Sequence, residues 1–72
     1  MDPNAAWLNL VEALSFDDIE AASEYALALI QWLNNNGFPP NTLPTQLPAN
    51  WDRLICYSVC QQVISSAFQN GA

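Results

Sequence analysis

Four of the chain's five prolines crowd into one short stretch, at positions 39, 40, 44 and 48. Proline lacks the backbone donor and disfavours a helical conformation in the residue before it, so neither a helix nor a strand can run through this stretch. The prolines belong to a repeat of four residues, Pro40-Asn41-Thr42-Leu43 followed by Pro44-Thr45-Gln46-Leu47. We predict a connector over residues 38–49 that lays Leu43 and Leu47 on the core. A docking peptide is the alternative, although prolines four apart do not match the spacing of proline-x-x-proline ligands.

Before the connector, the sequence predicts two helices. The first covers residues 3–14: Asp2 can cap its N-terminus and Pro3 suits the first helical position. Its apolar face is spaced i, i+3, i+4, i+7 and comprises Trp7, Leu10, Val11 and Leu14.

The second predicted helix covers residues 16–35, with Ser15 as its cap. Its main apolar stripe is Ile19, Ala22, Ala26, Leu29, Ile30 and Leu33. Gly37 suits a left-handed C-terminal cap, Phe38 can fold back onto the helix end, and Pro39 prevents the helix from continuing.

After the connector, a third helix is predicted over residues 50–69, with Asn50 as its cap and Asp52 in its first turn. Its broad apolar face comprises Trp51, Leu54, Ile55, Val59, Val63, Ile64, Ala67 and Phe68. An almost uncharged helix is poorly suited to a solvated surface, so we expect the central helix of the fold or the seam of a dimer. The predicted fold is all-α: a single domain over 1–72, in which a helical hairpin receives the third helix.

The charge balance restricts the partners. The chain has seven acidic residues and a single basic one, Arg53, for a net charge of −6. Binding to nucleic acid or to an anionic membrane requires several basic side chains, so neither is expected. The opening Met1-Asp2-Pro3-Asn4 has no basic or apolar region of a signal peptide, and we expect a cytoplasmic protein with reduced thiols.

Catalytic chemistry has little support. The sequence has no histidine and no lysine, which removes imidazole bases, imidazole metal ligands and Schiff bases. Cys56 and Cys60 share one helical face and could supply half of a metal site or pair with a second copy, but buried free cysteines usually act as small apolar residues. We predict no enzyme and no cofactor.

The width of the apolar arc on the last two helices predicts contact with a partner protein. Trp7 and Trp51 are expected in the core, whereas Tyr25 and Trp32 lie on a flank and suit either core or interface. The candidate interface residues are Tyr25, Leu27, Trp32, Cys56, Val59, Cys60 and Val63.

Three functions follow from these features. The first is an interaction module that associates with itself, most simply as a homodimer. The second is an acidic adaptor or inhibitor that binds a basic protein, with its charge imitating nucleic acid. The third, a remote alternative, is a metal or redox protein that depends on the two thiols.

Three segments of the first half resemble a known group of proteins. They are Met1-Asp2-Pro3-Asn4-Ala5, Glu12-Ala13-Leu14 and Trp32-Leu33 through Gly37-Phe38-Pro39. The chain resembles short, acidic, uncharacterised helical proteins of bacteria and their phages, which share the Pro-Asn-Ala start and a Trp-Leu before a Gly-Phe-Pro turn. The resemblance covers about half of the chain, and its motifs are a helix start and a helix stop. That family has no established function, so the resemblance implies no site.

Overall fold

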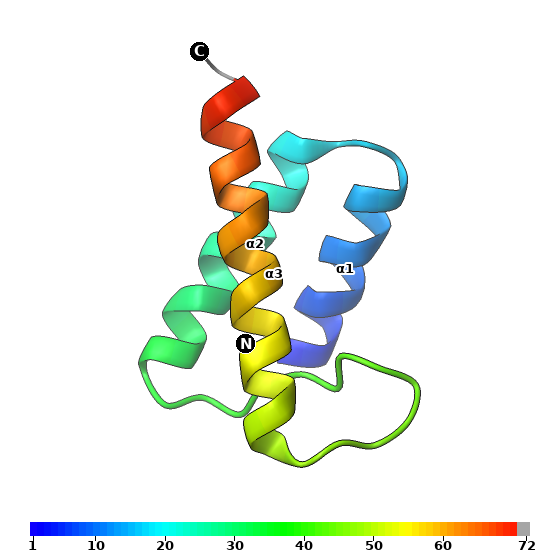
Figure 1. Ribbon diagram of the computed structural model, residues 1–72, viewed down its shortest axis with the longest axis vertical. Helices are drawn as coiled ribbons and strands as arrows, with labels where there is room; N and C mark the ends of the chain where they lie inside the picture. The colour runs from blue at the N-terminus through cyan, green and yellow to red at the C-terminus, as the bar shows by residue number, and fades with distance from the viewer. Residues whose placement is uncertain (71–72) are drawn as a thin grey trace.

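The computed structural model describes the backbone of residues 1–70 and the side chains of residues 1–68. It contains α1 (Pro3–Ser15), α2 (Ile19–Asn34) and α3 (Ala49–Asn70). Figure 1 shows α1 and α2 as an antiparallel hairpin, with α3 lying across it antiparallel to α2. The prediction of a small all-α domain is confirmed.

The first helix begins and ends as local chemistry dictates. The Asp2 carboxylate accepts hydrogen bonds from the backbone N–H groups of Asn4, at 3.0 Å, and Ala5, at 3.3 Å, which confirms the predicted cap. At the other end, the Asp18 N–H donates to the Ala13 carbonyl, and Asp17 adopts a left-handed conformation with φ 58°. This is the Schellman arrangement, with aspartate in the position that usually holds glycine.

The second helix starts later than the sequence predicts. The turn that ends α1 includes Phe16 and Asp17, so α2 begins at Ile19, and its cap is the Asp18 carboxylate, which accepts from the Ala21 N–H at 3.2 Å. Ser15 does not cap α2, because its hydroxyl donates to the Glu12 carbonyl of its own helix.

The C-terminus of α2 repeats the Schellman arrangement one residue earlier than predicted. Asn36 is the left-handed residue, with φ 63°, and the Gly37 N–H donates to the Trp32 carbonyl at 2.9 Å. Glycine is required at position 37 for another reason: a Cβ there would overlap the Trp32 indole, whose Nε1 donates to the Phe38 carbonyl at 2.7 Å. The prediction that Phe38 folds back onto the helix is wrong, since its ring is 80% exposed.

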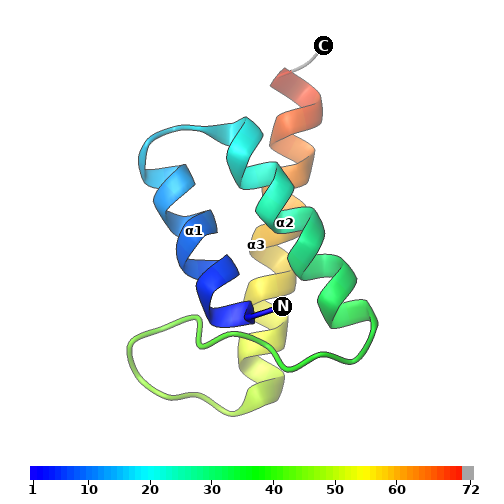
Figure 2. The same cartoon turned by 180° about the vertical axis from the view of Figure 1, so that it is seen from behind.

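The connector passes beneath the N-terminus of α1 before it reaches α3, as Figure 2 shows. Pro40 is fully buried, and the Asn41 N–H donates to the Asn4 side-chain oxygen at 2.8 Å. Leu43 remains exposed and Leu47 is half-buried, so the expectation that both cover the core holds only in part. Buried Asp52 accepts hydrogen bonds from Thr42 in the middle of the connector, and half-buried Arg53 donates to the Leu33 and Gly37 carbonyls just before the connector begins.

All three helices contribute to one core. Its buried residues are Trp7, Leu10 and Ala13 from α1, Ala22, Ala26, Leu29 and Leu33 from α2, and Cys56, Cys60 and Val63 from α3. Two expectations about the third helix are wrong: α3 begins at Ala49, so Asn50 lies within its first turn, and Trp51 is exposed. Trp51 projects from α3 into solvent, where the described residues leave it uncovered.

A candidate interaction surface along the third helix

The third helix carries large apolar side chains on its solvent side as well as on its core side, with exposed Ser58, Gln61, Gln62 and Ser65 between them. Cys56, Cys60 and Val63 face the core, whereas Leu54 and Tyr57 on one side and Trp51 on another reach solvent. Contacts between α3 and the hairpin are made mainly with α2 and only weakly with α1. This packing therefore leaves several large apolar side chains of α3 uncovered.

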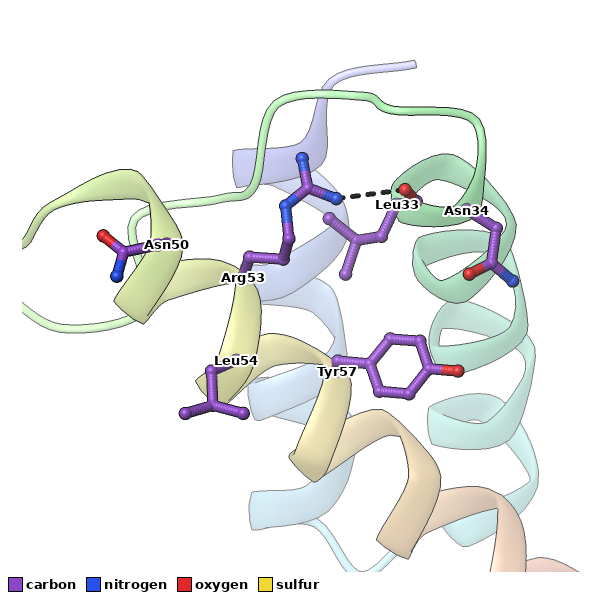
Figure 3. Close-up of a pocket in the computed structure, with 6 residues that line it drawn as sticks. All are labelled: Leu33, Asn34, Asn50, Arg53, Leu54 and Tyr57. Atoms are coloured by element: carbon purple, nitrogen blue, oxygen red, sulfur yellow. Dashed lines mark hydrogen bonds between the residues drawn. The ribbon is translucent and has the colours of Figure 1, made fainter.

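On one exposed side, α3 and the C-terminus of α2 line a hollow of about 530 Å³, and the face that the two helices share on this side is called the groove below. Figure 3 shows the lining of this hollow: Leu33, Asn34, Asn50, Arg53, Leu54 and Tyr57. The Arg53 guanidinium closes the end of this hollow by donating to the Leu33 carbonyl at 3.0 Å and to the Gly37 carbonyl at 2.8 Å. The only basic side chain of the chain thus holds the C-terminus of α2 against α3.

A second hollow, of about 420 Å³, lies between the N-terminal half of α2 and the C-terminal half of α3. Phe68 projects beside it with 79% of its surface exposed, and Glu20 is the acidic residue in its wall. The remaining lining residues are Ile19, Ser23, Leu27, Ile64 and Ala67.

The predicted interface residues separate into two groups. Leu27 is 49% exposed in the second hollow, and Tyr25, Trp32 and Val59 are half-buried, so a partner can reach these four. By contrast, Cys56, Cys60 and Val63 belong to the core of the chain itself and could meet a partner only if the fold opened. The structure adds Leu54, Tyr57 and Phe68, which the sequence pattern either assigned to a core face or left unassigned.

The two thiols are buried side by side without forming a disulfide. Their mutual hydrogen bond, followed by burial, raises the pKa of Cys56 above its usual range. The same hydrogen bond lowers the pKa of Cys60, whereas burial acts to raise it. Among the described residues, no three His, Cys, Asp or Glu side chains are grouped closely enough to hold a metal ion.

Acidic side chains gather at the opposite end of the hairpin from Arg53, around the turn between α1 and α2. Glu12 and Asp18 line a small hollow of about 190 Å³ there, next to the half-buried ring of Tyr25. Asp17, Glu20 and Glu24 are exposed on the same part of the chain. No helix in the described part of the chain has the length and apolar character needed to span a bilayer.

A scan against protein-family models and searches of the curated proteins and of the solved structures found no match to this chain. The resemblance to short acidic proteins of bacteria and phages therefore stays a prediction.

Proposed function

We propose that the protein is a non-enzymatic interaction module that associates with itself through the uncovered surface of α3. The observation that carries the proposal is that the hairpin covers one side of α3 and leaves Leu54, Tyr57 and Phe68 of this helix exposed. Large apolar side chains exposed along one face are characteristic of protein-binding sites. With two reduced, buried thiols, the module suits the cytoplasm.

Burial of apolar surface would supply the free energy of association, with aromatic side chains as its main contributors. Tyr57 and Phe68 are the aromatic residues on the groove side of α3. The acidic turn between α1 and α2 lies away from the middle of this groove and would remain in solvent, where its charge limits further aggregation.

The test measures molar mass by light scattering coupled to size-exclusion chromatography over a range of micromolar concentrations. Wild type is expected to approach twice 8.0 kDa as concentration rises. Leu54→Ser, in the groove, should shift the protein toward monomer, whereas Leu8→Ser, at an exposed leucine of α1, should not. A monomer at every concentration would remove this proposal.

The charge distribution favours a second candidate, an adaptor or inhibitor that binds a basic protein. Five of the seven acidic residues lie around the turn between α1 and α2, and Arg53 lies at the other end of the hairpin, where backbone carbonyls occupy it. Binding of a basic peptide should then weaken as salt rises and should be lost in Asp17→Lys/Glu20→Lys/Glu24→Lys. Asp18 is left intact in that variant because its carboxylate caps α2.

A further inference from the structure

The two hollows lie on one face of the α2–α3 pair, near its opposite ends, and the groove is this face. At 3.6 residues per turn, Tyr57, Ile64 and Phe68 fall on one side of α3. Along α3, Leu54 marks one end, Phe68 marks the other, and Gln61 lies midway between them on the same side, two turns from each. The groove is therefore a strip centred on Gln61 with different chemistry at its two ends.

The two ends complement each other. One end offers an apolar hollow beside Arg53 and Leu54, whereas the other offers the projecting ring of Phe68 beside Glu20. A twofold axis through the strip at Gln61 would place each end of one copy over the opposite end of a second copy. We infer that two copies pair in this way, with α3 antiparallel to α3 and Phe68 of each copy seated in the Arg53–Leu54–Tyr57 hollow of the other. This inference rests on the proposed self-association and names its surface and symmetry.

Charge favours this pairing over other arrangements of two acidic molecules. Arg53 has five N–H donors, and the two hydrogen bonds to Leu33 and Gly37 leave donors free for the carboxylate of Glu20 from the second copy. Between Arg53 and the end of α3 there is no charged residue, so no like charges meet along the strip. Gln61 faces its own equivalent at the axis, where two side-chain amides can exchange hydrogen bonds and fix the register.

The size of the strip fits a dimer. The segment from Asn50 to Phe68 is about 27 Å long, and two helices lying about 8–10 Å apart give it a width of roughly 20 Å. The flat outline of the strip is thus about 540 Å², about two-thirds of the roughly 800 Å² per partner that a stable complex buries, and the side chains that project from it add to this area. A buried area of roughly 800 Å² is about a sixth of the 4828 Å² that the single chain exposes.

Cysteine cross-linking tests the axis directly. Gln61→Cys places a thiol where the two copies meet, and Gln62→Cys places one on an adjacent exposed position that the helix turns away by about 100°. Both variants are incubated with oxidised glutathione, which accepts the two electrons as two thiols lose their protons and join. Wild type is the control for Cys56 and Cys60, whose burial should keep them reduced.

Gln61→Cys is expected to form a covalent dimer at least about tenfold faster than Gln62→Cys, because pairing gives its thiols a high effective concentration. Equal rates, or a faster reaction for Gln62→Cys, would overturn the proposed axis even if wild type dimerises in light scattering. Failure of wild type to dimerise at all would overturn the self-association as well, so the two outcomes are distinguishable. Circular dichroism of both variants confirms that each retains the helical fold.

Discussion

The Asp52 carboxylate accepts two hydrogen bonds from Thr42, one from the backbone N–H at 3.1 Å and one from the hydroxyl at 2.7 Å. Asp52 is only 4% exposed, so the pair joins the connector to the first turn of α3 within the protein interior. The connector is held at this point by polar contacts and at Pro40 by burial.

Removing the carboxylate should cost more than removing the hydroxyl. Asp52→Ala leaves the Thr42 N–H without its acceptor, which costs about 1–3 kcal/mol of unfolding free energy, whereas Thr42→Val loses one hydrogen bond, worth about 1 kcal/mol. Urea denaturation followed by circular dichroism measures both. Equal destabilisation by the two variants would contradict the role of the Thr42 backbone contact.

At the end of α2, replacing Gly37 by alanine and replacing Asn36 by glycine should change the stability of the fold in opposite directions. Gly37→Ala should destabilise the fold by about 1–3 kcal/mol, because the new methyl group displaces the Trp32 indole from the Phe38 carbonyl. Asn36→Gly should be neutral or stabilising by up to about 1 kcal/mol, since glycine adopts the left-handed conformation without strain. Thermal unfolding of both single variants measures these changes.

A double-mutant cycle identifies the cause at position 37. In a Trp32→Leu background, Gly37→Ala should lose most of its effect, since the ring that the methyl group meets is gone. An undiminished cost in that background would point to the backbone instead.

These two positions also show what sequence patterns can and cannot predict. The Asp2 cap, the helical order and the break at the prolines follow from local preferences, and all appear in the structure. The position of the left-handed residue at the end of α2 does not follow from local preferences. Gly37 has the strongest local preference for that conformation, but Asn36 adopts it instead. The hydrogen bonds that bring the indole against Gly37 depend on where the connector runs, and no short sequence window records that path.

The core face of α3 cannot be chosen from the sequence pattern. Apolar and polar residues are mixed around this helix, so its periodicity gives no phase that identifies the side facing the core. Trp51 was therefore assigned to the core and lies outside, whereas Cys56, Cys60 and Val63 were assigned to an interface and lie inside. Which side of α3 faces the core is decided by how α2 packs against it.

The buried thiol pair should make the fold sensitive to alkali. The ordinary pKa of a cysteine thiol is 9.0, and the hydrogen bond with Cys60 together with burial raises that of Cys56 in the folded state. Above pH 9.0 the unfolded chain loses both thiol protons, whereas the folded chain retains the proton on Cys56, so the stability that this thiol contributes is fully present below pH 9.0 and falls as the pH rises. The lowered pKa of Cys60 has the opposite effect only below pH 9.0, where the folded chain releases that proton first. One retained proton contributes a slope of about 1.4 kcal/mol per pH unit.

Denaturation midpoints measured between about pH 7 and pH 10 test this slope against Cys56→Ala/Cys60→Ala. The double variant should lose the part of the alkaline destabilisation that comes from the thiols. An identical pH dependence in both proteins would show that the pair releases its protons as readily when folded as when unfolded.

Self-association should strengthen as salt is first added. Two copies that each carry −6, about 23 Å apart, repel each other by roughly 3 kcal/mol where the Debye length is about 30 Å, and by less than about 1 kcal/mol where it is about 10 Å. Two symmetry-related contacts between Glu20 and Arg53 are surface ion pairs, worth at most about 1 kcal/mol each and only partly screened over the same range. Raising NaCl from about 0.01 M to about 0.1 M should therefore lower the dimer dissociation constant by roughly tenfold or more. Sedimentation equilibrium measures the constant, and Asp17→Asn/Glu24→Gln, with two fewer negative charges away from the groove, should respond less to salt than wild type.

A basic partner bound at the acidic turn would show the reverse dependence, with affinity falling as salt rises, so the sign of the salt effect distinguishes the two functions on the same protein.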